Sequence, residues 1–253
     1  MSVGRPLVEV RGIRYGYPGG AAALQGVSLQ VSAGERLAVL GPNGAGKSTL
    51  LLHLNGLLLP AQGSVLVDGI VVSEATARET RRRVGFVFQN PDDQLFLPTL
   101  LEDVAFAPLN DGQPGPAAEA RARATLRELG IEHAADRAAH HLSGGERRLA
   151  ALATVLVSRP DVLVLDEPTD ALDARGRRRV VDLLRGRPET LVVATHDLAA
   201  AAALCERAVV LDEGVVVWDA PLDRLLAAHP FLERHGLMAP LPDQPSGAPK
   251  RQA

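Results

Sequence analysis

The stretch RLAVLGPNGAGKSTLLLHLNGLL, residues 36–58, decides the fold. It begins with the pattern of a buried strand and ends with the pattern of a helix. Between the two lies a glycine-rich loop that fits G-x-x-x-x-G-K-[ST], in the context that this pattern demands. Glycines let backbone N–H groups turn toward phosphate oxygens, and the helix start adds a favourable dipole. We therefore expect nine residues to hold a nucleotide: Gly41, Pro42, Asn43, Gly44, Ala45, Gly46, Lys47, Ser48 and Thr49.

Two of these side chains have definite tasks. Lys47 is a compact positive charge for the β- and γ-phosphates, and the Ser48 hydroxyl can bind Mg²⁺. Lysine is otherwise rare, because the chain has only Lys47 and Lys250 and relies on arginine for positive charge. The loop therefore predicts ATP and Mg²⁺ as cofactors.

Strand and helix patterns extend outward from the loop. Residues 7–40 and 64–72 read as short strands separated by turns, and DVLVLDEP and ETLVVATHD are continuous apolar runs typical of parallel sheets. Between about residues 90 and 158 helical patterns dominate. We expect an α/β core with N-terminal antiparallel β elements and an inserted helical subdomain.

Bulk properties are those of a folded protein without a nucleic-acid partner. The chain has 253 residues, 46% of them hydrophobic and 23% charged, and its net charge of −3 gives no electrostatic case for nucleic acid. No signal sequence or membrane-length apolar run is visible, so we expect a cytoplasmic chain. Cys205 is the single cysteine and reads as core filler.

Two carboxylates end the strand in DVLVLDEP. Asp166 and Glu167 stand at its carboxyl end, the edge where ligands bind in doubly wound sheets. Asp166 is a candidate partner of Mg²⁺, and Glu167 can act as the general base that polarises the attacking water. The alternative is a polar strand end that caps the next helix. Together with the phosphate loop, the catalytic interpretation is favoured.

His196 ends the next strand, at the same edge. Its imidazole can contact the γ-phosphate and hold water and base in line, although a lone histidine is often structural. We considered three other histidines as metal ligands: His53, His140 and His141. They lack the spacing of a metal site and read as structural or exposed.

A second glycine motif lies in HLSGGERRLAALATVLVSRP, residues 141–160. Ser143, Gly144 and Gly145 precede a run with helical periodicity, so they can form another anion site at a helix start. An ordinary helix cap is the alternative. One nucleotide does not need two such sites on one chain, which indicates a second nucleotide or a second chain.

At this point the chain resembles the ABC ATPases, the nucleotide-binding subunits of ABC transporters. The resemblance covers about residues 7–235 and includes GPNGAGKST, Gln89, LSGGE, VLVLDEP, ALD and ATHD in the family's order. It implies a P-loop NTPase fold of the ABC ATPase type and ATP hydrolysis coupled to transmembrane transport. It also implies a head-to-tail dimer, in which Ser143 and Gly145 of one subunit close over ATP held by Lys47 of the other.

The resemblance assigns further residues. Asp173 in ALD lies at the dimer seam, and Tyr17 stacks on adenine, with Tyr15 as a substitute or either tyrosine as core. Gln89 ends a strand at the nucleotide edge, where its amide oxygen reaches Mg²⁺ and the attacking water. Two departures from the family pattern stand out. The signature continues ERRLA, where many relatives carry a glutamine after the glycines and an arginine two residues later, and Asp170 and Ala171 stand where small residues and a glycine are commoner. Neither removes a catalytic group.

The stretch VGFVFQNPDDQLFLPTLLEDVAF, residues 84–106, narrows the resemblance. It is similar to the ATPase subunits of energy-coupling-factor importers for a transition-metal ion (cobalt or nickel) or a vitamin. That implies a second ATPase subunit, a membrane scaffold subunit and a substrate-capturing membrane subunit at the cytoplasmic face of the cell membrane. Five apolar residues are expected to line the docking groove, unless they form the core of the helical insertion: Leu95, Phe96, Leu100, Leu101 and Val104.

Other functions remain open from the sequence. The chain could serve another type of ABC transporter, or be an ABC ATPase that acts without a transporter. Residues 1–237 are expected to form the ATPase domain, with the helical subdomain at about 90–158. Residues 238–253, rich in proline and polar residues, are expected to be a disordered tail.

Overall fold

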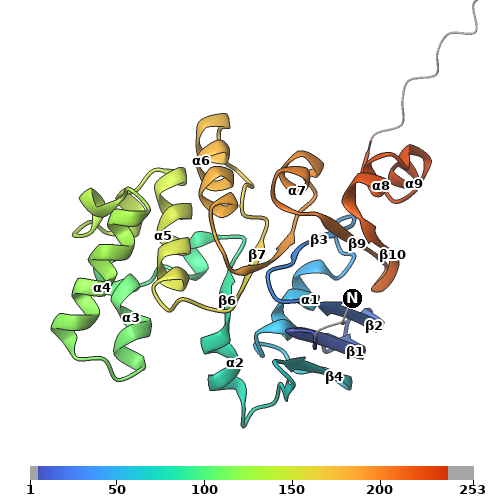
Figure 1. Ribbon diagram of the computed structural model, residues 1–253, viewed down its shortest axis with the longest axis horizontal. Coiled ribbons are helices and arrows are strands. Elements are labelled where there is room, and N and C mark those ends of the chain that lie inside the picture. Colours follow the sequence, from blue (N-terminus) through green and yellow to red (C-terminus); the bar gives the residue numbers. More distant parts are fainter. Residues whose placement is uncertain (1–4, 239–253) are drawn as a thin grey trace, which may run out of the picture.

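A six-stranded, mostly parallel sheet lies at the centre of the protein, whose computed structural model describes residues 5–238 (Figure 1). The strand order is β10-β9-β3-β8-β7-β6, and only β10 runs antiparallel to its neighbour. The strands are β3 (Arg36–Leu40), β6 (Val84–Val87), β7 (Val162–Asp166), β8 (Thr190–Ala194), β9 (Arg207–Asp212) and β10 (Val215–Pro221).

Alternate residues of each strand enter two separate cores. Leu37 and Val39 of β3 belong to one apolar cluster, and Ala38 and Leu40 belong to the other. Because both faces of the sheet are covered, its strands read as continuous apolar runs without polar alternation. This explains why DVLVLDEP and ETLVVATHD are recognisable as strands.

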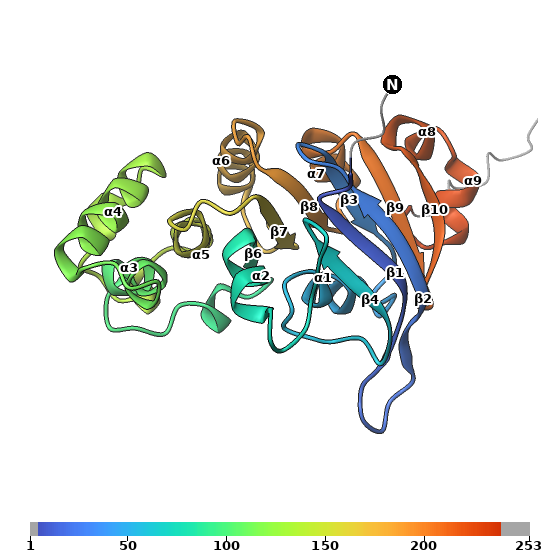
Figure 2. The same cartoon turned by 60° about the horizontal axis from the view of Figure 1, so that its bottom comes forward.

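A second, antiparallel sheet covers one face of the first (Figure 2). Its order is β2-β1-β4-β5, and helix α1 (Lys47–Leu54) contacts strands of both sheets. The N-terminal antiparallel elements predicted from the sequence are therefore confirmed. The strands are β1 (Val8–Gly16), β2 (Ala22–Val31), β4 (Gln62–Val67) and β5 (Ile70–Val71).

Helices gather at the opposite end of the molecule, as the sequence predicts (Figure 1). No strand occurs within residues 88–161, all of which are described. Capping boxes begin two of these helices: Thr99 pairs with Glu102, and Ser143 pairs with Glu146. The helices are α3 (Leu100–Asn110), α4 (Gly115–Glu128) and α5 (Gly144–Leu156), with short 3-10 turns at Pro91–Asp93, Glu132–Ala134 and Ala139–His141.

Four of the five residues expected to line the docking groove instead form the core of the helical insertion, which was the alternative. Leu95, Leu100, Leu101 and Val104 are buried in the core of the helical region, where α3 packs against α4 and α5. Only Phe96 is exposed, at 65% of its surface, with its ring 5.5 Å from that of Phe106. The apolar stripe of α3 faces inward because burying it against two helices removes it from water.

The remaining helices flank the central sheet. The single thiol, Cys205, is buried as expected, and burial raises its pKa to about 12. None of the helices in residues 5–238 is long and apolar enough to cross a membrane. The proposed tail, apart from Met238, lies outside the described residues. The helices are α2 (Ala77–Arg83), α6 (Ala174–Arg185), α7 (Leu198–Leu204), α8 (Leu222–Leu226) and α9 (His229–Arg234).

Candidate functional site

The loop between β3 and α1 has a backbone that only glycine can adopt at two positions. Gly41 and Gly46 have φ angles of 149° and 100°, in the positive range that favours glycine. A Cβ at Gly41 would lie 2.1 Å from the carbonyl oxygen of Leu211, and one at Gly46 would lie 2.4 Å from that of Ala23. Since both neighbours are backbone atoms, a larger residue would displace a strand. The loop can therefore turn tightly over the start of α1.

Lys47 is a buried cation held by this loop. Its Nζ donates hydrogen bonds to the carbonyl oxygens of Gly41 at 2.7 Å and Pro42 at 3.0 Å. Burial lowers the pKa of the ammonium group, while the Glu167 and Asp166 carboxylates oppose that shift. A desolvated cation bonded to neutral carbonyl oxygens gains from an anion, so the site suits phosphate.

Asp166, the last residue of β7, is a buried carboxylate with an unpaired oxygen. Within the described residues its Oδ1 has no hydrogen-bond partner. Burial raises the pKa of Asp166, whereas a hydrogen bond from the Ser48 hydroxyl lowers it. A hydroxyl and an unpaired carboxylate oxygen are ligands that Mg²⁺ takes, usually completed by water and phosphate oxygens. The residues present therefore fit this cation.

The described chain offers no larger ligand set. Within residues 5–238, no group of three or more His, Cys, Asp or Glu side chains is arranged to hold a metal ion. Of the other histidines, buried His53 bonds through Nδ1 to the carbonyl oxygen of Thr49 at 2.7 Å, and the rings of His140 and His141 lie 4.1 Å apart. A site for Mg²⁺ thus depends on Ser48, Asp166 and phosphate oxygens, with Gln89 of the same pocket as the further predicted ligand.

Both oxygens of the Glu167 carboxylate are held in place. His196 contacts Oε1 through Nδ1 at 2.9 Å, and the buried hydroxyl of Thr195 donates to Oε2 at 3.0 Å. The backbone of Glu167 has φ 45°, which is unfavourable for a residue with a side chain. This turn directs the carboxylate from the end of β7 toward the neighbouring end of β8. There the backbone N–H of Glu167 donates to the carbonyl oxygen of Ala194 at 2.9 Å.

These side chains meet in one cleft of about 590 Å³, a size typical of ligand sites. Gln89 lines this cleft and donates a 3.2 Å hydrogen bond to Asp170, which departs from the family pattern together with Ala171. The predicted residues that line the cleft are Tyr17, Asn43, Gly44, Gly46, Lys47, Ser48, Thr49, Gln89, Asp166, Glu167 and His196. Most predicted loop residues, the two strand ends and Gln89 are thus brought together. Of the other predicted loop residues, Gly41 and Pro42 line a neighbouring pocket that shares Asn43 and His196, and Ala45 is buried.

The two tyrosines lie at different depths. Tyr17 is 44% exposed in the cleft, and its hydroxyl lies 3.3 Å from that of Thr49. Tyr15 is half-buried, with its ring 4.8 Å from the buried His53 ring and 5.2 Å from Tyr17. Only Tyr17 offers an accessible ring at the cleft, while Tyr15 supports it from the core side.

Two residues of this region were not predicted from the sequence. Thr195 holds the Glu167 carboxylate, and the adjacent position of His196 in ATHD was the only signal for it. Arg148 is buried, donates to the carbonyl oxygen of Phe88 at 3.0 Å, and leaves its Nε without a partner among the described residues. Burial lowers its pKa, and the carboxylates of Asp170, Asp166 and Glu167 act against this. Arg148 therefore brings positive charge from α5 to the acidic strand end.

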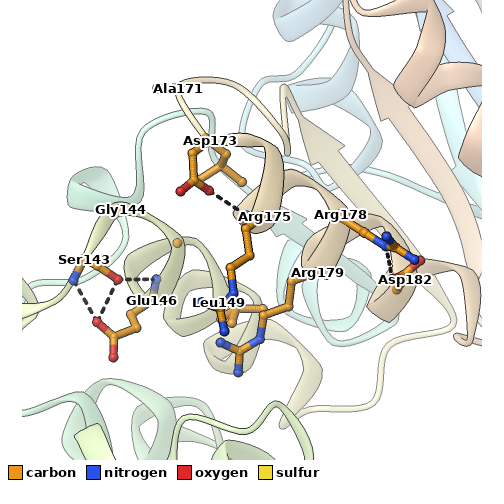
Figure 3. A pocket seen from close by; sticks show the side chains of 13 residues that line it. Ser143, Gly144, Glu146, Leu149, Ala171, Asp173, Arg175, Arg178, Arg179 and Asp182 are labelled. Atoms are coloured by element: carbon orange, nitrogen blue, oxygen red, sulfur yellow. Dashed lines mark hydrogen bonds and ion pairs between the residues drawn. The ribbon is translucent and has the colours of Figure 1, made fainter.

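The second glycine motif lines a different pocket, of about 870 Å³, between α5 and α6 (Figure 3). Ser143 is the N-cap of α5 and Asp173 is the N-cap of α6, where it accepts a 2.7 Å hydrogen bond from the N–H of Gly176. Arg175 and Arg179 project from α6 into the space between the helices. Arg179 also caps the end of α4 through the carbonyl oxygens of Leu129 and Gly130 at 2.9 and 3.0 Å.

No described residue lines both pockets. Ser143, Gly144, Gly145 and Asp173 therefore do not reach the phosphate loop of their own chain. The segment after Glu167 connects the cleft with this second pocket: Asp170 lines the cleft, and Ala171, with φ 55°, lines the second pocket.

Comparison with known proteins decides the family. The sequence profile of the family described as "ABC transporter" matches residues 24–170, more than half of the chain. This chain belongs to the ABC transporter family. It is an ATP-binding and ATP-hydrolysing subunit, with the P-loop fold of the ABC ATPases. The resemblance drawn from the motifs is thereby confirmed.

Three relatives show which proteins this ABC ATPase is similar to in sequence. It is 51% identical to an ABC transporter ATP-binding protein of Gloeobacter violaceus, over 93% of this chain and 97% of the relative. The energy-coupling factor transporter ATP-binding protein EcfA of Methanothermobacter thermautotrophicus is 46% identical over 83% of this chain and 70% of the relative. The cobalt import ATP-binding protein CbiO of Rhodobacter capsulatus is 45% identical over 93% and 86%.

Solved structures share the fold. CbiO1 of Clostridium perfringens, described as part of the ABC transporter complex CbiONQ, matches with a TM-score of 0.78 and 35% identity, over 93% of this chain and 96% of that one. The ATP-binding cassette MJ0796, solved as a dimer in a post-hydrolysis state with ADP and phosphate, matches with a TM-score of 0.78 and 31% identity. That match covers 85% of this ABC ATPase and 98% of the cassette.

Proposed function

We propose that this ABC ATPase powers an energy-coupling-factor type importer of a transition-metal ion, cobalt or nickel, or of a vitamin. The observation that carries the proposal is the cleft in which Lys47, Asp166 and Glu167 meet, with Gln89 at its rim. The likeness to EcfA and CbiO, at 46% and 45% identity, supports the type of transporter. Residues 1–237 act as the ATPase domain, and residues 238–253 follow it as a tail.

The phosphates of ATP enter the loop of residues 41–46. The ammonium of Lys47 then exchanges its carbonyl partners for β- and γ-phosphate oxygens, and adenine stacks on the exposed ring of Tyr17. Ser48, Asp166 and Gln89 would hold Mg²⁺, which would supply positive charge to the phosphates. The amide nitrogen of Gln89 donates to Asp170 at 3.2 Å, which leaves the amide oxygen available for the cation.

Glu167 serves as the general base for hydrolysis. It accepts a proton from water while the water oxygen bonds to the γ-phosphorus, and the bond from phosphorus to the β–γ bridging oxygen breaks to leave ADP and phosphate. His196 at 2.9 Å and Thr195 at 3.0 Å fix the carboxylate, yet each carboxylate oxygen retains a second acceptor position for the water. Buried Arg148 offsets the repulsion between neighbouring carboxylates.

Two subunits close head to tail over the nucleotides. The pocket of Ser143, Gly144 and Gly145 lies apart from the phosphate loop of its own chain, so it serves the nucleotide of a partner subunit. Asp173 lies beside these glycines at the same pocket, at the seam. The dimeric state of the MJ0796 cassette supports this arrangement. The partner is a second copy or a related ATPase.

A membrane scaffold subunit docks at an exposed aromatic patch, defined by Phe96, Phe106 and Leu109. These side chains are 65%, 43% and 46% exposed, and the two rings pack edge to face. Exposed aromatic clusters of this kind mark protein contacts. Gln94, two residues before Phe96, joins the end of β6 to α5, since it accepts from the N–H of Phe88 at 3.2 Å and donates to the carbonyl oxygen of Ala151 at 2.8 Å. Docking places the ATPase at the cytoplasmic face of the membrane.

Copurification from native membranes tests this proposal. The tagged chain is purified after gentle solubilisation, beside the double variant Phe96→Ser and Phe106→Ser and the control Val71→Ser, which alters an apolar residue 51% exposed on β5. We expect a polytopic scaffold and a substrate-capturing subunit with the wild type and the control, and their loss in the double variant. Recovery of a different membrane protein would indicate another type of ABC transporter. Recovery of soluble partners alone would overturn the transport proposal.

A further inference from the structure

The hydroxyl of Ser143 is already engaged in this subunit. It donates a 2.8 Å hydrogen bond to Oε2 of Glu146 and accepts a 3.3 Å bond from the Glu146 N–H. The same Oε2 also accepts the N–H of Ser143 at 2.9 Å. Figure 3 shows this closed pair at the start of α5, at the edge of the second pocket. The hydroxyl has a single proton, and Glu146 holds it.

Two side chains on neighbouring segments, His133 and Arg137, hold the Glu146 carboxylate in this position. His133 contacts Oε1 through Nε2 at 3.0 Å, and the Arg137 guanidinium lies close enough to favour the charge. Hydrogen bonds from the backbone and hydroxyl of Ser143, together with His133, lower the pKa of Glu146 to about 2. Glu146 is therefore a full negative charge at neutral pH.

A phosphate that approaches Ser143 meets two obstacles. Its oxygens are acceptors, so they require the proton that the hydroxyl now gives to Glu146. They are also negative, and the Glu146 carboxylate lies one hydrogen bond from the atom they must reach. A hydrogen bond to a charged acceptor is roughly twice as strong as one to a neutral acceptor, so the existing bond competes effectively.

We infer that Glu146 is a positioning residue that opposes closure of the dimer by holding the hydroxyl of Ser143 away from the partner's nucleotide. This rests on the proposed head-to-tail dimer. Closure breaks the bond between Ser143 and Glu146 in both subunits, and His133 and Arg137 then retain the released carboxylate. ATP must therefore bind more tightly to close this dimer than one in which a neutral amide stands at residue 146.

The substitution Glu146→Gln tests the inference without removing the helix cap. Glutamine also completes a capping box, so α5 keeps its start, while the acceptor becomes neutral. The chain offers a matched control in Glu102→Gln. Glu102 forms the same box with Thr99, with distances of 2.9, 2.9 and 3.3 Å, at the start of α3, and it lines neither pocket. Both substitutions are made in the full chain that carries Glu167→Gln, so that bound ATP persists.

The measurement is the ATP concentration that gives half-maximal dimer in analytical ultracentrifugation. Since a charged acceptor is replaced by a neutral one in each subunit, we expect Glu146→Gln to lower it by about tenfold and Glu102→Gln to leave it unchanged. The gain should vanish when Ser143→Ala is added, because the effect acts through the Ser143 hydroxyl. Unchanged dimerisation with Glu146→Gln, or a gain that survives Ser143→Ala, would overturn the inference alone. If the Glu167→Gln parent forms no dimer with ATP, the proposed dimer fails and the inference fails with it.

Discussion

The hydroxyl of Thr195 donates a 3.0 Å hydrogen bond to the carboxylate of Glu167. The bond joins the ends of two neighbouring strands, because Thr195 follows β8 and Glu167 follows β7. Thr195 also accepts the N–H of Asp197 at 3.1 Å, so its proton is directed at the carboxylate. A buried hydroxyl thus orients the group proposed as the general base.

Removing this hydroxyl should slow hydrolysis more than it weakens ATP binding. Valine has the shape of threonine without the donor, so Thr195→Val leaves Oε2 of Glu167 free to turn. We expect kcat to fall by about tenfold with a nearly constant KM for ATP, as for loss of one bond to a charged group. Thr190→Val is the control, since this buried threonine of β8 accepts the N–H of Gly34 at 2.9 Å, far from the cleft. An equal loss of kcat in both variants would contradict the positioning role.

The role of Glu167 as the base is tested by Glu167→Gln. The amide cannot accept the proton of water, so turnover should fall at least about a hundredfold while ATP still binds. Glu213→Gln is a matched control, because Glu213 also has a positive φ of 47° but lies in the turn between β9 and β10. Phosphate release and nucleotide binding are measured for both variants. Near-normal turnover of Glu167→Gln would exclude this residue as the base.

Much of the cleft is predictable from the sequence because its parts are local. The backbone of the phosphate loop requires glycine at positions 41 and 46. The apolar run of β7 ends at Asp166, which marks the end of a buried parallel strand. Parallel strand ends then meet at one edge of the sheet, which brings His196 to Glu167 without further information. The fold class and the ATPase family follow from these motifs.

Other features depend on contacts between distant parts of the chain. Arg148 looks like an exposed helix residue in LSGGERR, yet it is buried because α5 packs against the end of β6. The period of Leu100, Leu101 and Val104 predicts an apolar face but does not say whether a helix of the same chain or a partner covers it. Here α4 and α5 cover it. Periodicity gives the face of a helix, and only the packing gives its neighbour.

The protein should be more stable with glycine in place of Ala171. Its φ of 55° lies in the left-handed region, which costs about 1–2 kcal/mol for a residue with a Cβ. Glycine removes that cost but gains freedom in the unfolded chain, which offsets about 0.4–1 kcal/mol. We expect Ala171→Gly to stabilise the protein by about 1 kcal/mol, seen as a Tm raised by about 2–4 °C.

The control for this prediction is Ala138→Gly. Ala138 has an ordinary φ of −73°, so glycine there relieves no strain and only increases the freedom of the unfolded chain. Its Tm should fall slightly. The prediction is wrong if both variants move in the same direction.

Glu146 should stabilise the folded subunit at neutral pH and lose this effect in acid. Its folded-state pKa is about 2, below the ordinary value of 4.5. A depressed pKa contributes stability that is present above the unfolded value and disappears as the pH falls through the folded value. Glu146→Gln cannot titrate, so we expect it to lower the free energy of unfolding more at pH 7 than at pH 3, measured by urea unfolding. A deficit that is constant or larger at pH 3 would contradict the assignment. The same carboxylate that opposes dimer closure then supports the single subunit, because both effects come from its bonds to Ser143.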